Sequence, residues 1–202
     1  MKNEKELSEM AEVFQNIYIE KKWVQGCENS PSMSGPGSFP DVVENWLERL
    51  KNFLEEKKIT SVVDYGCGDF AVYKNFNWKD INYTGIDISP LAIDLAKANA
   101  PKNNNFNFIC DKTLDLPAAD LLIIKDVLGH WSGLRSTRKL GDKRYMITDF
   151  LSSNMGKFKH ILIVDAIHQV IEEYFPKKFV PAKEILRFGG KKDKKSLYIY
   201  ST

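Results

Sequence analysis

Two acidic residues stand at the ends of apolar, β-branched runs in the first half of the chain. Asp64 lies in the run Val62-Val63-Asp64-Tyr65, directly before Gly66-Cys67-Gly68, and Asp87 ends the run Tyr83-Thr84-Gly85-Ile86-Asp87. A Gly-x-Gly turn after a strand lets the backbone approach a ligand closely, and an acid about 20 residues later can accept hydrogen bonds from both hydroxyls of a ribose. The pair therefore indicates a site for a nucleoside-containing cofactor.

The charges around the glycine turn indicate the kind of ligand. The sequence from Gly66 to Ala71 fits the general pattern G-x-G-x-x-G/A, which nicotinamide, flavin and other nucleoside-binding proteins share. A pyrophosphate is best bound by backbone amides and a helix N-terminus with no negative side chain nearby. Because Asp64 precedes the turn and Asp69 follows it, the turn better suits a ligand with a positive charge, such as an ammonium or a sulfonium.

The composition is that of a globular protein with one domain. The 202 residues are 43% hydrophobic and 28% charged, and a chain of this length needs neither disulfides nor a metal to hold its core. The net charge of +2 creates no global field that would attract a polyanion. No apolar stretch reaches about 18 residues and the N-terminus lacks the apolar core of a signal peptide, so we expect a cytoplasmic protein without a membrane partner. The three cysteines are widely spaced, and we expect reduced thiols.

The alternation of strand and helix patterns predicts an α/β fold. The runs that read as strands are Ser61–Tyr65, Tyr83–Asp87, Phe106–Cys110, Ala119–Lys125, His160–Asp165, Glu184–Phe188 and Leu197–Tyr200. Helical stretches separate most of them, which predicts βαβ units and a mostly parallel sheet. The segment that joins the last two runs is too short for a crossover helix, so the last strand should be antiparallel to its neighbour.

Two amphipathic helices are expected before the first strand. Apolar residues recur at intervals of three and four over Leu7–Tyr18 and again over Val42–Leu54. The segment between them, from Gly26 to Pro40, is rich in Ser, Gly and Pro. Its centre, Ser34-Gly35-Pro36-Gly37-Ser38, is either a plain linker or a source of backbone amides and hydroxyls for an anionic group of a ligand.

Together these motifs resemble those of class I S-adenosylmethionine-dependent methyltransferases. The resemblance extends from about Ser61 to His168 and rests on Val63-Asp64-Tyr65-Gly66-Cys67-Gly68, Gly85-Ile86-Asp87, Asp111 and the run from Pro117 to Trp131. It implies a doubly wound, Rossmann-like α/β fold with a seven-stranded, mostly parallel sheet and an antiparallel C-terminal strand. Within one domain, residues 1–58 would supply two helices and a Ser/Gly/Pro lid over the cofactor, and residues 59–202 the S-adenosylmethionine-binding core.

The resemblance also implies roles for individual residues in binding S-adenosylmethionine and its product S-adenosylhomocysteine. Asp64 would receive the amino group of the methionine portion, Asp87 would bind the ribose hydroxyls and Ile88 would pack on the adenine. Asp111 would contact the adenine amino group, with Lys112 beside it. The other residues expected around the cofactor are Gly66, Cys67, Gly68, Ser34, Gly35, Gly37 and Ser38.

The end of the fourth expected strand carries the residues implied in catalysis. Lys125 and Asp126 lie where the methyl group would face the acceptor, and His130 follows Asp126 by one helical turn. A histidine oriented by a carboxylate titrates near neutrality, so His130 is a candidate general base and His168 a second one. Both histidines are also consistent with a structural role. Methyl transfer from a sulfonium mainly needs a positioned acceptor, so a base is optional.

We expect the methyl acceptor to be a small polar or saccharide-like molecule that is methylated at a hydroxyl, with a nitrogen as the alternative acceptor atom. The sequence contains no recognisable RNA-binding module, which favours a small acceptor. A basic stretch either forms a solvated face or binds an anionic acceptor such as a nucleotide or an RNA; it comprises Arg135, Arg138, Lys139, Lys143 and Arg144. A nicotinamide-dependent oxidoreductase and a catalytically silent cofactor-binding module are the remaining alternatives.

Overall fold

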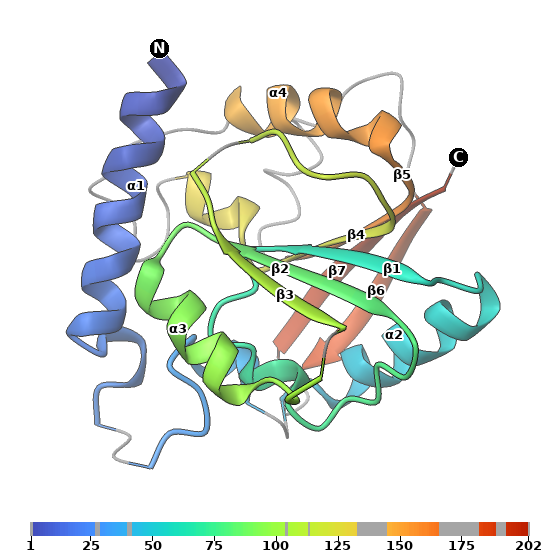
Figure 1. The fold of residues 1–202 in the computed structure, drawn as a ribbon, viewed down its shortest axis with the longest axis horizontal. Helices are drawn as coiled ribbons and strands as arrows, with labels where there is room; N and C mark the ends of the chain where they lie inside the picture. Colours follow the sequence, from blue (N-terminus) through green and yellow to red (C-terminus); the bar gives the residue numbers. More distant parts are fainter. Residues whose placement is uncertain are drawn as a thin grey trace.

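A seven-stranded sheet forms the centre of the protein (Figure 1). The computed structural model describes residues 2–26, 29–39, 42–103, 105–112, 114–132, 145–165, 182–188 and 193–201. The strand order is β3-β2-β1-β4-β5-β7-β6, and the first five strands are parallel, whereas β7 runs antiparallel to both β5 and β6. The strands are β1 (Ser61–Tyr65), β2 (Asn82–Asp87), β3 (Phe106–Cys110), β4 (Ala119–Lys125), β5 (Phe158–Asp165), β6 (Ala182–Phe188) and β7 (Asp193–Ser201). The expected fold class is confirmed, including the antiparallel last strand.

Helices cover both faces of the sheet. Those in the described ranges are α1 (Lys2–Ile19), α2 (Glu44–Glu56), α3 (Pro90–Asn99) and α4 (Tyr145–Asn154). Neighbouring side chains on a strand point to opposite faces, so Leu122 joins the core that contains α4 and Leu121 joins the core that contains α2. Burial on both faces explains why the central strands are nearly continuous apolar runs. None of the helices within the described ranges combines the length and hydropathy that crossing a lipid bilayer requires.

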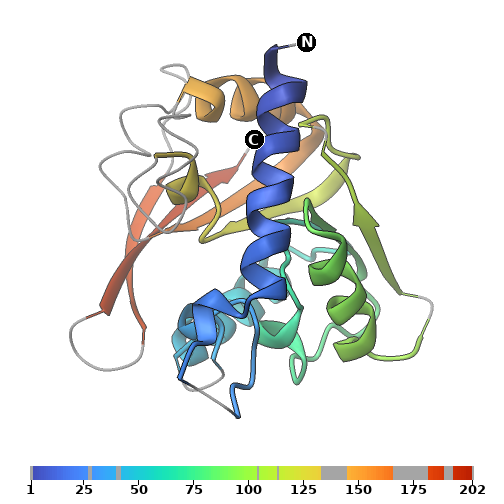
Figure 2. The ribbon, with the colours of Figure 1, turned by 90° about the vertical axis from the view of Figure 1, so that its left-hand side faces the viewer.

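Helix α1 lies across the carboxyl edge of the parallel strands, and Figure 2 looks toward that edge. Met10 of α1 is buried in the same core as α4. The side chain of Gln15 is joined to the start of α3, because its Oε1 accepts hydrogen bonds from Ser89 Oγ at 2.7 Å and from Leu91 N at 3.1 Å. Ser89 also caps α3, since its hydroxyl accepts a hydrogen bond from Ala92 N. The first helix is therefore fastened to the core beside the end of β2.

The strand register brings the chemically interesting residues to one edge. Asp64 in β1 pairs with Gly85 in β2, so Asp87 lies at the same edge, two positions further along. β4 ends at Lys125, opposite Val164 near the end of β5. Open α/β sheets bind ligands at this carboxyl edge. The connection from β1 to β2 contains a short 3-10 helix, Ala71–Tyr73.

Candidate functional site

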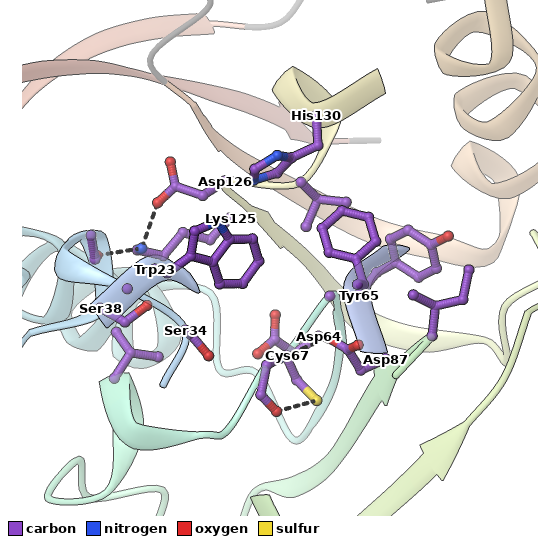
Figure 3. Close-up of a pocket in the computed structure, with 18 of the residues that line it drawn as sticks. Trp23, Ser34, Ser38, Asp64, Tyr65, Cys67, Asp87, Lys125, Asp126 and His130 are labelled. Atoms are coloured by element: carbon purple, nitrogen blue, oxygen red, sulfur yellow. Dashed lines mark hydrogen bonds and ion pairs between the residues drawn. The ribbon is translucent and has the colours of Figure 1, made fainter. Parts of the chain in front are cut away.

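A cavity of about 340 Å³ opens at the carboxyl edge of the sheet (Figure 3). This size lies in the range of small-molecule sites. Among the residues predicted from the sequence, those that line the cavity are Ser34, Gly35, Gly37, Ser38, Asp64, Gly66, Cys67, Gly68, Asp87, Ile88, Lys125, Asp126 and His130. Asp111 and Lys112 are not part of the lining, although the N–H of Asp111 donates to the backbone oxygen of Asp87 at 3.1 Å. His168 and the basic residues between 135 and 144 lie outside the described residues.

Asp87 connects the end of β2 to the glycine turn. Its Oδ2 accepts from the N–H of Gly68 at 3.0 Å, and its Oδ1 accepts from the N–H of Ser89 at 2.9 Å. Burial raises the pKa of Asp87 to about 6, while these backbone hydrogen bonds act in the opposite direction. Two backbone amides thus position the Asp87 carboxylate on the cavity wall. Further hydrogen-bond donors from a ligand would stabilise its ionised form.

Asp64 is more deeply buried than Asp87, and only 2% of its surface is exposed. The hydroxyl of Tyr83 donates to its Oδ2 at 2.5 Å. Burial raises the pKa of Asp64 to about 7, and the nearby negative charge of Asp87 adds to this, whereas the Tyr83 hydrogen bond and the charge of Lys125 lower it. An incoming cation would stabilise the ionised form of such a carboxylate. This end of the cavity therefore favours a positively charged group.

Two positions of the glycine turn require glycine, because of their backbone angles and of the atoms packed against them. Gly66 and Gly68 have φ angles of +77° and +58°. A Cβ on Gly66 would lie 2.3 Å from Val127 Cγ2, and one on Gly68 would lie 2.4 Å from Ser34 Oγ. Phe70, two residues after Gly68, also adopts the left-handed conformation, with φ of 61°.

Asp69 has a different environment from the one its position in the sequence predicts. Its position directly after Gly68 predicts a negative charge beside the ligand. Its carboxylate instead accepts hydrogen bonds from the segment before α2, from Ser32 Oγ at 3.1 Å, Met33 N at 2.5 Å and Ser34 Oγ at 2.9 Å. Asp69 is only 2% exposed. It therefore fastens the Ser/Gly/Pro loop, residues 29–39, to the glycine turn.

Ser34 and Tyr18 complete this attachment. The hydroxyl oxygens of Tyr18 and Ser34 lie 2.7 Å apart, and Ser34 Oγ also accepts from the N–H of Asp69 at 3.0 Å. Burial raises the pKa of the Tyr18 phenol well above its usual value, and the negative charges of Asp87 and Asp69 add to this effect. Tyr18 is consequently a neutral hydroxyl at the cavity wall. Helix α1, the Ser/Gly/Pro loop and the glycine turn meet at this point.

Two lysines and one carboxylate form a charged corner in the cavity. The Nζ atoms of Lys125 and Lys195 lie 2.7 Å and 2.5 Å from the same Asp126 Oδ2. Lys125 Nζ also donates to the backbone oxygen of Gly37 at 2.8 Å. Although burial alone would raise the pKa of Asp126, the charges of Lys125 and Lys195 hold it well below its ordinary value. Asp126 is therefore ionised between two ammonium groups.

His130 lies among aromatic rings instead of beside the Asp126 carboxylate. It is carried by the 3-10 turn Leu128–Ser132 that follows β4. Its ring centroid is 5.4 Å from that of Phe14 and 5.7 Å from that of Trp23. In Figure 3 the Asp126 side chain points toward Lys125, away from the His130 ring. The expected pairing of Asp126 with His130 is therefore replaced by a pairing of Asp126 with lysines.

Several cavity residues were not selected from the sequence. Phe14 and Tyr18 belong to the apolar stripe of α1, which the periodicity assigns to core packing, and Trp23 follows that helix as an isolated aromatic residue. Lys195 is one member of a lysine-rich turn typical of solvent-exposed loops. Only the pairing of β7 with β5 brings Lys195 to the carboxyl edge, and no local pattern signals this.

The fold is that of a Rossmann-like α/β protein, and its cavity lies at the carboxyl edge of the sheet with Asp64 and Asp87 in its lining. The chain belongs to the methyltransferase domain family, whose model matches residues 56–186. It is an S-adenosylmethionine-dependent methyltransferase, and S-adenosylmethionine is its cofactor. The predicted family is confirmed. No curated protein matches the chain in sequence.

Three solved structures that share the fold are distant from the chain in sequence. Magnesium protoporphyrin IX methyltransferase (ChlM) from Synechocystis PCC 6803, crystallised with bound SAM, is 13% identical, with a TM-score of 0.62 over 97% of this chain and 96% of that one. TrmN from Thermus thermophilus is 12% identical, with a TM-score of 0.57 over 75% of this chain and 47% of that one. The bifunctional kinase-methyltransferase WbdD is 16% identical, with a TM-score of 0.56 over 79% of this chain and 38% of that one. The chain thus spans less than half of TrmN and of WbdD.

Proposed function

We propose that this methyltransferase acts on a small polar or saccharide-like acceptor and methylates it at a hydroxyl. The observation that carries the proposal is one cavity of about 340 Å³ with two chemically different ends. Asp64 and Asp87 make one end acidic, while Lys125 and the rings of Trp23 and His130 line the other. A cofactor at the acidic end would present its methyl group to an acceptor at the second end. The enclosure by α1 and the Ser/Gly/Pro loop favours a small molecule over an RNA.

In this proposal the acidic end binds S-adenosylmethionine. Asp87 accepts hydrogen bonds from the two ribose hydroxyls, Asp64 compensates the positive charge of the methionine end, and Ile88 packs against the adenine. The backbone of the glycine turn, including Cys67, lies along the methionine portion. Asp111 and Lys112 stand outside the cavity wall and reach the adenine only if its outer edge extends past Ile88.

Residues 1–58 act as the cover of the same domain in this proposal. Three side-chain contacts support it: Gln15 to the start of α3, Tyr18 to Ser34, and Asp69 to the Ser/Gly/Pro loop. Ser34, Gly35, Gly37 and Ser38 then face the cofactor and acceptor from above the sheet. A cover of this kind excludes water, which strengthens the electrostatic interactions inside the cavity.

The chemistry is an in-line displacement. The acceptor oxygen attacks the methyl carbon, the carbon–sulfur bond breaks, and sulfur keeps the electron pair, which leaves neutral S-adenosylhomocysteine. The hydroxyl proton must leave the acceptor oxygen. His130 is the proposed recipient, because its ring lines the acceptor end of the cavity, whereas Lys125 and Asp126 position the acceptor.

Replacing His130 with alanine tests this assignment. We expect turnover to fall by about a hundredfold, the usual contribution of a general base, with unchanged affinity for S-adenosylhomocysteine. The measurement is formation of S-adenosylhomocysteine from S-adenosylmethionine across a panel of hydroxylated sugars and ring compounds. His160→Ala is the matched control, since His160 lies on β5 and contacts Ser201 at the other end of the sheet. An equal loss of turnover and cofactor affinity in His130→Ala would show a structural role instead.

The raised pKa values of Asp87 and Asp64 predict that cofactor affinity depends on pH. Both carboxylates must be ionised to bind, so affinity should rise as the pH rises through about 6 and 7. At about pH 5 only about a tenth of Asp87 and about a hundredth of Asp64 are ionised. If both must be ionised, binding of S-adenosylhomocysteine should be about a thousandfold weaker at about pH 5 than at about pH 8. Stability of the cofactor-free protein should change in the opposite direction. A pKa raised on folding makes the free energy of unfolding fall as the pH rises from about 4 to about 7.

Calorimetric titrations between about pH 5 and about pH 8 measure how the affinity for S-adenosylhomocysteine changes with pH. Urea unfolding at the same pH values measures how the free energy of unfolding changes. Asp87→Asn should flatten the part of the affinity profile centred near pH 6. A wild-type affinity that is flat over this range would contradict the proposed roles of the two carboxylates.

A further inference from the structure

We propose that the acceptor is a ring-bearing acid: a flat or saccharide ring that carries a carboxylate or a phosphate near the hydroxyl to be methylated. The proposal deepens the proposed function and rests on it. It comes from the charged corner formed by Lys125, Asp126 and Lys195 and from the aromatic wall formed by Phe14, Trp23 and His130.

The charged corner contains two ammonium groups directed at one oxygen atom. Lys125 and Lys195 both lie within 2.7 Å of Asp126 Oδ2, and their side chains are only 7% and 11% exposed. Both lysines line the cavity, so an anionic substituent of the acceptor can approach two ammonium groups there. Hydrogen bonds between an ammonium group and a carboxylate or phosphate are among the stronger ones in proteins.

The carboxylates at the opposite end of the cavity would determine which way round an anionic acceptor binds. Asp64 and Asp87 repel an anion and attract the sulfonium end of the cofactor. An acidic acceptor would therefore enter with its anionic group toward Lys125 and Lys195. Such an arrangement leaves the rest of the acceptor between the lysines and the methyl group.

The aromatic wall adjoins the charged corner. Trp23 packs against the Ser/Gly/Pro loop, because a Cβ on Gly35 would lie 3.1 Å from Trp23 Cβ. Two residues further along, the backbone oxygen of Gly37 accepts from Lys125. The ring centroids of Trp23 and His130 lie 5.7 Å apart, and both residues line the same cavity as Lys125. A ring packed on this wall would hold an acidic substituent within reach of the lysines.

The carboxylate of the cofactor's own methionine end is a competing occupant. The charge of Lys125 lowers the pKa of Asp64, so Lys125 is electrostatically coupled to the part of the cavity proposed for that end. Lys195 reaches the corner from β7, on the opposite side of β5 from β4. A test must therefore be made with the cofactor site already filled.

The experiment titrates the complex with S-adenosylhomocysteine using four small probes. Benzoate and phenyl phosphate carry the anion, benzamide is the neutral match of benzoate, and benzylamine carries a cation. We expect benzoate or phenyl phosphate to bind at least about tenfold more tightly than benzamide, the size of one charge-assisted interaction. The tighter of the two anions identifies carboxylate or phosphate. Equal binding of benzoate and benzamide, preference for benzylamine, or no binding of any probe would overturn the proposal.

Three variants assign the preference to the corner. Lys195→Met should abolish the preference for the anion and Lys195→Arg should restore most of it. Lys159→Met is the charge-matched control, because Lys159 is 73% exposed and pairs with Asp120 at the other end of the sheet. If Lys195→Met still prefers the anion, the proposal is wrong. It is also wrong if the variant lowers the affinity for S-adenosylhomocysteine as much as the affinity for benzoate, because Lys195 then serves the fold or the cofactor. Failure of the wild type to bind S-adenosylhomocysteine would instead contradict the proposed function.

Discussion

Asp87→Ala should weaken binding of S-adenosylhomocysteine by about tenfold to a few hundredfold. The proposed hydrogen bonds from the ribose hydroxyls go to a charged acceptor, and each such bond contributes about 1.5 to 3 kcal/mol. Asp87 also accepts from the amides of Gly68 and Ser89, so the variant loses part of the order of the glycine turn. Isothermal titration calorimetry of the purified variant measures the loss.

Two further variants separate the ribose contact from general effects. Asp87→Asn keeps the shape and one acceptor oxygen, and we expect an intermediate loss of affinity. Asp94→Ala removes the same charge from the exposed face of α3 and should leave affinity unchanged. If folded Asp87→Ala bound S-adenosylhomocysteine as tightly as the wild type, the ribose assignment would be wrong.

Gly68→Ala is expected to damage both stability and cofactor binding. A methyl group at this position would lie 2.4 Å from Ser34 Oγ and 3.0 Å from Tyr18 OH, at a φ angle of +58°. Left-handed strain and the displacement of a packed neighbour together predict a fall of about 2 to 4 kcal/mol in the free energy of unfolding. Because the clash pushes the Ser/Gly/Pro loop away from the glycine turn, we expect affinity for S-adenosylhomocysteine to fall by at least about tenfold.

Gly26→Ala supplies the matched control for Gly68→Ala. Gly26 also has a positive φ, of +81°, but no atom lies within 4 Å of the position of its Cβ. It should therefore show the backbone strain alone, about 1 kcal/mol, with unchanged cofactor affinity. Urea unfolding and the same titration measure both variants. Equal behaviour of the two would mean that the close approach of Ser34 to the turn is unimportant.

The sheet was predictable because its signals are local. β1, β3 and β4 begin and end at the residues that the apolar runs predict, and β2 and β5 begin only one or two residues earlier than predicted. The larger difference is in β7, which extends from Asp193 to Ser201, whereas only Leu197–Tyr200 is apolar enough to read as a strand. Its polar ends are held by pairing with β5 and β6, which the local sequence does not show.

The acidic end of the site was also predictable, whereas the acceptor end was not. Asp64 is the last but one residue of β1 and Asp87 is the last residue of β2, so parallel pairing alone brings them to the same edge of the sheet. Lys195, in contrast, meets Asp126 only through the antiparallel pairing of β7, at a separation of 69 residues. The position of Asp69 beside the turn predicts a charge near the ligand, but it does not reveal that the hydroxyls of Ser32 and Ser34 donate to its carboxylate. The features that the sequence does not predict, Lys195 in the cavity and the hydrogen bonds of Asp69, both depend on side-chain partners that are distant in the chain.

The most direct test of the account is equilibrium binding of S-adenosylhomocysteine and of NAD to the wild-type protein, measured separately by calorimetry. The carboxylates at the carboxyl edge predict one site for S-adenosylhomocysteine and no binding of NAD, since Asp64 disfavours a pyrophosphate beside the glycine turn. Saturable NAD binding together with no heat from S-adenosylhomocysteine would contradict the assignment of this cavity to a cationic sulfur nucleoside.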